Sequence, residues 1–372
     1  MPSTRPESRR AFHELLDLLR EMGDRYAGPE WLVQSDDDVG EALRAILHLL
    51  EASLLTRMES TPEHPWLREF PLPTRKFLGD NADAIYYETA ISPRHSYRLR
   101  GNMAGAVYVS ITVEAGAPDG GFSQKTAGVI NDSQFDVAAD GSFEIRLGGP
   151  PAPRNWLGLA PDACRITTRH YFEDDVPAPV RPRHIDFRIE VLDPAPPPDA
   201  PNDHNVADAI RRVATFLRTS TLDMGAPPRE NQPAFVSRVP NQFVQPVKPG
   251  EHALAAADAA YSMAPFMIPP GHALVVRGRW PADCRCANVC LWNRHMQTFD
   301  YLNRTVSLNR RQTKLEPDGS FRLVIAHEDP GVPNWLDTEG RAFGLVFFRF
   351  MLPQSEIETP RGELVPLASL RG

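Results

Sequence analysis

The residues with the clearest capacity for chemistry lie in the stretch 286–336. It holds His295 and, further along the chain, the adjacent pair His327 and Glu328. A histidine titrates near neutral pH and exchanges protons with a bound molecule most effectively when a carboxylate orients it. These residue types predict general acid–base chemistry, with His295 and His327 as acid–base groups and Glu328 as their orienting carboxylate.

The same stretch is rich in arginine, at positions 294, 304, 310 and 311. A guanidinium offers a planar fork of donors that matches carboxylate, sulfate and phosphate. We therefore expect an anion clamp beside the histidines, in a ligand site made of Arg294, Arg310, Asn293, Asn309 and Trp335. The ligand that fits this set is a mainly apolar small molecule with an anionic or hydroxylated end.

Strands must position these side chains. Strict alternation places one row on a single strand face, Val289, Leu291, Asn293, His295 and Gln297, and a second row on another, Phe321, Leu323, Ile325 and His327. An apolar row that turns polar toward one end predicts a sandwich with a ligand-binding mouth, because buried polar groups need partners.

Other interpretations of these residues stay open. Arginine and histidine on antiparallel strands commonly form a solvated face, and two histidines with one carboxylate also suit a metal-dependent, cupin-like enzyme. A non-catalytic carbohydrate-binding or protein-interaction module would use exposed aromatic rings such as Tyr86, Tyr87, Tyr301 and Trp292. The residues do not decide whether the chain is an enzyme, and we expect no cofactor and no bound metal.

Composition narrows the possible partners. The chain has 372 residues, 37 prolines and a formal net charge of -8, with its basic residues dispersed. Nucleic acid is excluded as an expected partner because backbone binding needs a positive surface. There is no signal peptide or long apolar span, so we expect no membrane insertion and a cytoplasmic protein with four reduced cysteines.

Proline is poorly tolerated in helix interiors and central strands, which favours many short strands joined by rigid loops. Period-two alternation begins near residue 84, and turn signals separate strands predicted at 128–137, 141–147 and 164–172. Amphipathic helices are predicted before the strands, one with an apolar face at Phe12, Leu15, Leu16, Leu19 and Met22. A second, capped by Ser35, has the face Val39, Leu43, Ile46, Leu50 and Leu54, which we expect to cover a sheet.

The chain repeats itself. Asp140-Gly141-Ser142-Phe143 recurs as Asp318-Gly319-Ser320-Phe321, and Asn155-Trp156-Leu157 recurs as Asn334-Trp335-Leu336. Matches at a nearly constant offset indicate a duplication. We therefore predict a mainly β chain with two tandem antiparallel, jelly-roll-like β-sandwich units, 1–195 and 202–372, each preceded by an amphipathic helix. Residues that recur, such as Asn309 after Asn131, are expected to serve the shared fold.

The motif D-G-S-F, a strand, a proline-containing loop, N-W-L and the aromatic strand FGLVFFRFMLP together resemble the DUF1214 family. The first half resembles it through Asp140 to Phe143, Asn155 to Leu157 and ITTRHYF. The resemblance implies jelly-roll sandwiches and no assigned function. Two DUF1214-like copies stand here where family members often carry a different N-terminal β domain. Since a second copy can satisfy an interface within the chain, we expect a monomer or a weak homodimer.

Overall fold

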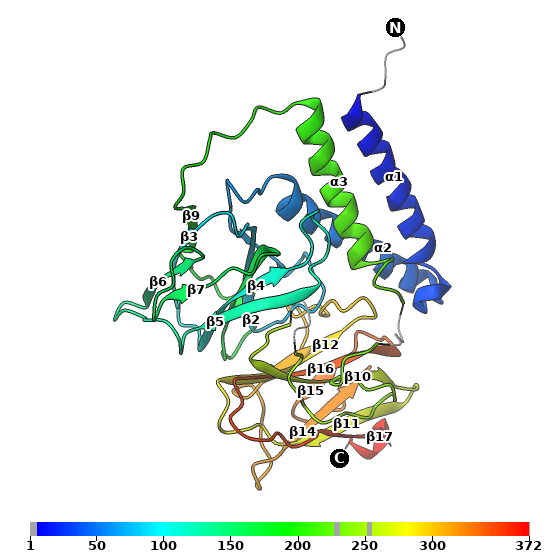
Figure 1. Cartoon of the computed structure of the whole chain (residues 1–372). Helices are drawn as coiled ribbons and strands as arrows, with labels where there is room; N and C mark the ends of the chain where they lie inside the picture. The colour runs from blue at the N-terminus through cyan, green and yellow to red at the C-terminus, as the bar shows by residue number, and fades with distance from the viewer. Residues whose placement is uncertain (1–5, 227–230, 251–254, 372) are drawn as a thin grey trace.

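The computed structural model describes residues 6–226, 231–250 and 255–371. Within them the chain forms three α-helices and seventeen strands. Figure 1 shows two β-sandwiches, one above the other, with the helices beside the upper one. The predicted mainly β architecture of two tandem sandwiches is confirmed.

The second helix begins directly after Ser35, the predicted capping residue. The three helices are α1 (Glu7–Arg25), α2 (Asp36–Ser53) and α3 (Asp203–Ser220), with a short 3-10 turn, η1 (Pro29–Trp31), and a π-helical turn, η2 (Leu54–Met58). Ser35 and Asn202 each form a capping box, in which the side chain accepts hydrogen bonds from the first helical turn. Two further 3-10 turns are η3 (Ala178–Val180) and η4 (Leu367–Ser369).

All three helices share one apolar cluster. Leu18 of α1, Leu49 of α2 and Phe216 of α3 are buried together, along with Phe70 and Phe77 from the segment before the first long strand. In the chain α3 precedes the second sandwich, as expected, but it packs on α1 beside the first sandwich (Figure 1). The predicted unit 202–372 therefore has its helix on the first sandwich, because the apolar face of α3 matches the other helices.

The first sandwich consists of two sheets. The larger has the order β1 (Arg68–Glu69), β2 (Ala84–Ala90), β8 (Ala163–Tyr171), β4 (Tyr108–Ala115) and β5 (Lys125–Asn131). The smaller has the order β7 (Trp156–Leu157), β6 (Ser142–Leu147), β3 (Tyr97–Asn102) and β9 (Arg188–Val191). Pairing is antiparallel except between β6 and β7.

The second sandwich repeats this order, except that the short strand β1 has no counterpart among its described residues. Its sheets are β10 (Ala259–Met267), β16 (Phe343–Met351), β12 (Cys286–Trp292) and β13 (Ser307–Asn309), then β15 (Trp335–Asp337), β14 (Phe321–Ala326), β11 (His272–Gly278) and β17 (Arg361–Pro366). β10-β16-β12-β13 corresponds to β2-β8-β4-β5, and β15-β14-β11-β17 corresponds to β7-β6-β3-β9. The strand order of the two sandwiches therefore shows the duplication that the sequence repeats indicate.

The recurring Asn-Trp pairs maintain the fold. Asn155 and Asn334 have φ angles of 55° and 59°, and each side chain accepts a hydrogen bond from a backbone N–H 2.8 Å away. Trp156 and Trp335 donate their indole N–H to backbone carbonyls at 2.9 and 3.1 Å. Trp335, expected to contact a ligand, therefore anchors a strand end, because its polar atom is already bonded within the sandwich.

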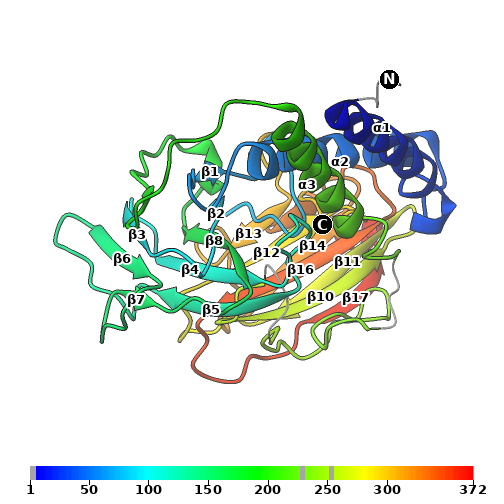
Figure 2. The same cartoon turned by 45° about the horizontal axis from the view of Figure 1, so that its top comes forward.

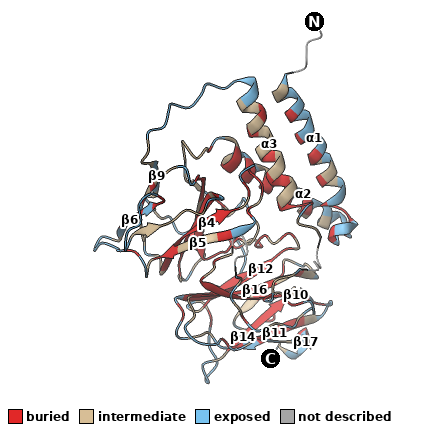
Figure 3. Cartoon of the chain, in the orientation of Figure 1, coloured by how far each residue is buried: buried red, intermediate tan, exposed pale blue. Residues whose placement is uncertain are grey.

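The large sheet of the first sandwich is buried on both faces. One face of β4 supplies Val109, Ile111 and Val113 to the core of that sandwich. The opposite face is polar but also completely buried, with Tyr108, Ser110, Thr112 and Glu114. Figure 3 shows β4 as one of the buried strands at the centre of the molecule.

The second sandwich covers this polar face at β2 and β8. Tyr86 and Tyr171 of the first half and Tyr261 of the second belong to a single buried cluster. Figure 2 shows β4 and β5 running beside β12, β16 and β10. We call the buried interface between the β1-β2-β8-β4-β5 sheet and the β10-β16-β12-β13 sheet the seam.

Candidate functional site

His295 lies in a turn and not on a strand. β12 ends at Trp292, and the side chain of Asn293 then accepts hydrogen bonds from the backbone N–H groups of His295 and Gln297, at 2.9 and 3.1 Å. The turn includes Met296, whose φ is 56°. The predicted polar row on one strand face is therefore wrong, because the strand ends before Asn293. Asn293, which was expected to bind a ligand, instead uses its side chain to close this turn.

The imidazole of His295 is 1% exposed, and neither ring nitrogen has a hydrogen-bond partner. It packs against the rings of Tyr26 and Trp31, with centroids 4.5 and 6.1 Å away. Burial and the neighbouring Arg294 guanidinium lower the pKa of His295 to about 3, although the Asp38 carboxylate opposes them. His295 is therefore a neutral, enclosed ring at neutral pH.

The other two expected catalytic residues lie elsewhere. His327 follows β14, and its ring nitrogens contact the Thr338 hydroxyl at 2.6 Å and the Ile268 carbonyl at 3.0 Å. Glu328 is exposed and pairs with Arg371 at 2.9 Å. No contact joins His295, His327 and Glu328 to one another, so the structure does not bring the expected acid–base group together.

Both arginines of the expected anion clamp already hold carboxylates. Arg294 donates to Asp38 at 2.5 Å and to a backbone carbonyl of the segment before α2. Arg310 forms a two-pronged pair with Glu173, at 2.7 and 2.8 Å. Saturated guanidiniums offer no free fork to a ligand, so the expected clamp is replaced by two structural ion pairs.

Three of the four aromatic rings expected to stack on sugars are inside the protein, and the fourth, Tyr87, is half-buried. Tyr86, Trp292 and Tyr301 are 7%, 3% and 4% exposed, so the predicted surface for carbohydrate is wrong on these residues. Among residues 6–226, 231–250 and 255–371, no three His, Cys, Asp or Glu side chains are placed to hold one metal ion. In the same residues no helix is long and apolar enough to cross a membrane.

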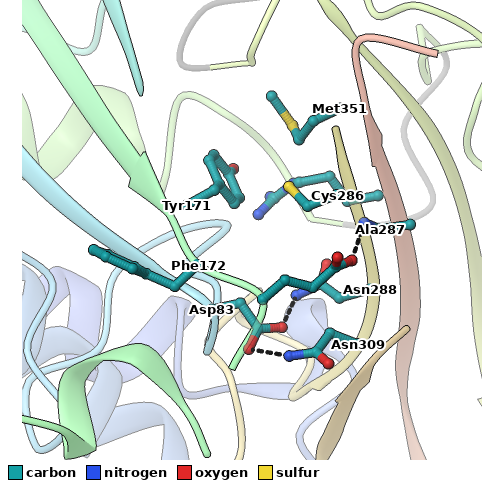
Figure 4. A pocket seen from close by; sticks show the side chains of 10 residues that line it. Asp83, Tyr171, Phe172, Cys286, Ala287, Asn288, Asn309 and Met351 are labelled. Carbon is teal, nitrogen blue, oxygen red and sulfur yellow. Dashed lines mark hydrogen bonds between the residues drawn. The ribbon is translucent and has the colours of Figure 1, made fainter. Parts of the chain in front are cut away.

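One expected ligand residue, Asn309, does lie at a pocket, and the pocket is in the seam. The Asn309 amide donates to Asp83 at 3.0 Å, and Asn288 donates to the other oxygen of Asp83 at 2.6 Å. Figure 4 shows the two asparagines of the second sandwich converging on this aspartate of the first. The free space of about 10 Å³ has room for roughly one water molecule.

The pocket wall is mostly apolar, with Tyr171, Phe172, Cys286, Ala287 and Met351 (Figure 4). Burial raises the pKa of the Cys286 thiol well above its ordinary value, so this sulfur stays protonated and unreactive. Glu173 also borders the pocket, where Arg310 and the backbone N–H of Ala287 occupy its carboxylate.

The seam has approximate two-fold symmetry that follows from the duplication. Asn309 of the second half donates to Asp83 of the first, and its counterpart Asn131 of the first half donates to Asp258 of the second at 2.9 Å. Tyr108 also donates to Asp258. Each sandwich therefore contributes an amide that holds a buried carboxylate of the other.

Asp83 has an unusual titration behaviour. Its complete burial raises the pKa to about 7, although the hydrogen bonds from Asn288 and Asn309 act in the opposite direction. The nearby Glu173 and Asp174 carboxylates add to the increase. Asp83 therefore changes between its neutral and charged forms near neutral pH, where His295 stays neutral.

Arg349 is the second unusual group at the seam pocket. Its side chain is 5% exposed, and no carboxylate of a described residue lies within ion-pair distance of it. It makes only long hydrogen bonds, to the Tyr86 hydroxyl at 3.4 Å and the Gly79 carbonyl at 3.3 Å, and its Nε has no partner. Aromatic rings surround it, with Phe347 at 5.0 Å and Tyr261 at 5.5 Å.

The other buried polar groups of this region belong to a loop, residues 76–83. Asp80 accepts from the Thr298 backbone N–H at 2.7 Å and from the Thr298 hydroxyl. Lys76 lies 4.0 Å from Asp80 and 3.3 Å above the Tyr301 ring, and its ammonium donates no hydrogen bond. Burial lowers the pKa of Lys76 to about 8.

Sequence reasoning missed this loop and Arg349, but signals for both exist. Arg349 is the single charged residue in the otherwise apolar run 343–352. Asp83 recurs as Asp258, whereas alanines at 255 and 256 stand where Asp80 and Asn81 would recur. The loop before β2 therefore carries polar residues that are present in only one half of the duplication.

The low pKa of His295 predicts acid sensitivity. The unfolded state binds a proton near pH 6.5 and the folded state only near pH 3, so stability should fall as pH drops between these values. His295→Phe keeps a ring between Tyr26 and Trp31 but cannot titrate. We expect urea unfolding of this variant to lose less stability over that pH range than the wild type does. Equal pH dependence in both proteins would contradict the assignment.

Comparison with known proteins found a family match in the second half of the chain. Residues 288–355 match the family model described as a protein of unknown function, DUF1214. A comparison with curated proteins found no match.

One solved structure shares the whole fold. The chain is similar to the crystal structure of an uncharacterised protein from Burkholderia cenocepacia, with a TM-score of 0.83 and 26% sequence identity over 98% of this chain and 99% of that one. It also matches the VPA0106 protein from Vibrio parahaemolyticus, at a TM-score of 0.48 and 13% identity, over 94% of this chain and 100% of that one. The Burkholderia match extends the likeness to the first sandwich and the helices.

Proposed function

We propose that this chain, which belongs to the DUF1214 family through residues 288–355, binds a small, mainly apolar carboxylic acid in the seam pocket. Arg349 would receive the carboxylate, and the wall around Tyr171, Phe172 and Met351 would receive the apolar part. The observation that carries this proposal is the state of Arg349, a buried guanidinium without a carboxylate partner.

An unpaired buried charge costs several kcal/mol in desolvation, and proteins normally pair it. The other deeply buried arginines with ion pairs follow this rule, since Arg57 and Arg165 both contact Glu88. Arg349 is different, because its partners are aromatic rings and two long hydrogen bonds. A ligand carboxylate would supply the missing negative charge and an acceptor for Nε.

Asp83 supports an acid rather than a polar neutral ligand. With a pKa of about 7, Asp83 is about half ionised at neutral pH and mainly neutral at lower pH, where the pocket carries the positive charge of Arg349 without an opposing charge from Asp83. Glu173 is offset by Arg310. The present pocket admits about one water molecule, so the ligand must displace a side chain, and the flexible Met351 is suited to move.

Acid–base catalysis is the second candidate function, and the titration of Asp83 near neutral pH favours it. Asp83, in place of the separated histidines, would exchange a proton with a ligand whose carboxylate is held by Arg349. The test is deuterium incorporation from solvent next to the carboxylate of a bound acid, followed by NMR. Exchange that persists in Asp83→Asn would remove the catalytic role but leave binding untouched.

The binding proposal is tested by titration calorimetry with a panel of short, unbranched monocarboxylic acids and their methyl esters. We expect the acids to bind and the uncharged esters not to bind. Arg349→Gln should abolish the heat of binding, whereas the control Arg294→Gln, which alters a largely buried ion pair with Asp38 away from the pocket, should retain it. If no acid binds, or if acids bind Arg349→Gln as well as the wild type, the proposal is wrong.

Binding should also depend on pH through Asp83. Raising the pH through about 7 ionises this carboxyl and places a negative charge beside the ligand, so affinity should decrease. Asp83→Asn stays neutral and should bind with similar affinity at about pH 6 and about pH 8. Wild-type affinity that is constant over this range would rule Asp83 out as a neighbour of the bound anion.

The cytoplasm is the proposed location. Cys164, Cys284, Cys286 and Cys290 are all free thiols, and the last three lie close in the chain without forming a disulfide. Reduced cysteines are typical of a cytoplasmic protein. Thiol titration of the protein from a reducing and an oxidising compartment would test this, since disulfides found in the native protein would contradict it.

A further inference from the structure

An apolar stripe on α2 faces outward. We define the α2 stripe as Val39, Leu43 and Leu47 of α2 together with Leu54, which follows as the first residue of η2; they are 37%, 42%, 62% and 40% exposed. The helix instead buries a smaller face, with Ala42, Ala45, Ile46 and Leu49. The sequence predicted that Val39, Leu43 and Leu54 would cover a sheet. That expectation is wrong, because the small alanines let α2 pack closely on its other side.

The stripe is continuous. At about 100° per residue, positions 39, 43, 47 and 54 fall within an arc of about 80° on the helix surface. Single exposed leucines are common on protein surfaces, but four in one row over about four helical turns mark a contact surface.

Charges beside the stripe favour a second copy of the same helix. Arg44 is exposed and forms no ion pair with any described residue. Glu51 lies two turns further along on the same side, where it pairs with Arg75 through side chains that are both half exposed. Exposed pairs contribute only about 0–1 kcal/mol, so Glu51 can exchange Arg75 for a cation of a second copy. If a second α2 runs antiparallel across the stripe, Arg44 of each copy lies beside Glu51 of the other. The helix is therefore complementary to itself, in charge as well as in apolar character.

We propose that the α2 stripe is the surface through which two copies of this chain form a homodimer, with the two α2 helices antiparallel. A membrane is a poor alternative, because the chain has a net charge of -8 and α2 begins with Asp36, Asp37 and Asp38, which anionic lipid repels. One helical stripe is small beside the roughly 800 Å² per partner of a stable interface, so the dimer is weak and depends on concentration.

Sedimentation velocity over a concentration series tests the proposal. The wild type should shift from monomer to dimer as concentration rises, and Leu47→Glu should remain monomeric at every concentration. The control is Leu315→Glu, which alters a leucine of similar exposure, 49%, on the second sandwich and should dimerise like the wild type. Circular dichroism confirms that each variant is folded, since Leu47 is a surface residue.

Charge exchange tests the antiparallel arrangement. Arg44→Glu and Glu51→Arg should each weaken dimerisation, and the double variant should restore it toward the wild-type value because the reciprocal pairs reform with opposite sign. A wild type that stays monomeric up to its solubility limit would overturn the proposal, as would a Leu47→Glu variant that dimerises normally. Co-sedimentation of the wild type, but not of Leu47→Glu, with anionic vesicles would assign the stripe to a membrane and also overturn it.

Discussion

Arg349→Met is expected to make the protein more stable while weakening its binding of a carboxylic acid. Methionine fills the space among Phe347, Tyr171 and Tyr261 without a buried charge. Replacing a buried charge by a well-packed apolar side chain often stabilises a protein, and we expect a gain on the order of 1 kcal/mol in urea unfolding. Loss of a charged hydrogen bond to the ligand should weaken binding by about tenfold to a hundredfold or more.

The matched control is Arg169→Met, a second buried arginine, on β8. Arg169 donates to the Thr112 hydroxyl at 2.6 Å, and the Glu114 carboxylate is the largest favourable influence on its charged form. Its loss leaves a buried carboxylate without its cation, so this variant should be destabilised. If Arg349→Met loses as much stability as Arg169→Met, then Arg349 stabilises the seam and its role is not to bind a ligand.

Glu88→Gln is expected to cause a large loss of stability. Glu88 is 2% exposed and pairs with both Arg57 of η2 and Arg165 of β8. Burial opposes ionisation of Glu88, but the two guanidiniums together hold its pKa below the ordinary value. Removing the charge leaves two buried cations unpaired, and breaking such a group typically costs about 3–5 kcal/mol.

The comparison for Glu88 is Glu144→Gln on the exposed face of β6. Glu144 also pairs with two arginines, Arg98 and Arg100, but its side chain is 53% exposed. Exposed pairs contribute about 0–1 kcal/mol, so this variant should unfold at nearly the wild-type urea concentration. A similar small loss for Glu88→Gln would show that the buried cluster is not what attaches η2 to the sheet.

The duplication explains why a site exists at the seam. Two copies of one fold place equivalent strands opposite each other, so Asn131 and Asn309 reach across in the same way. The copies then differ around these asparagines. Asp258 is held by Tyr108, whereas Asp83 lies beside the pocket and Arg349. The symmetric part maintains the interface, and the asymmetric part is where we propose ligand binding.

Much of the fold follows from local sequence signals. The capping residues Ser35 and Asn202 determined where α2 and α3 begin, because their side chains satisfy the free N–H groups of the first turn. The recurring Asn155 and Asn334 marked equivalent positions in two sandwiches, since both adopt the left-handed backbone that the same loop requires. Such features depend on neighbours within a few residues, which the sequence displays directly.

Tertiary structure determines which residues form the candidate site. Ser110, Thr112 and Glu114 alternate with apolar residues, as on a solvated strand face, but helices and the second sandwich bury them. His295 and His327 have suitable chemistry, but their environments leave one enclosed and the other bonded to the fold. The charge state and accessibility of a group depend on residues that are distant in the chain. For this reason a pKa near neutrality is found at Asp83, which lies more than 200 residues from the asparagines that hold it.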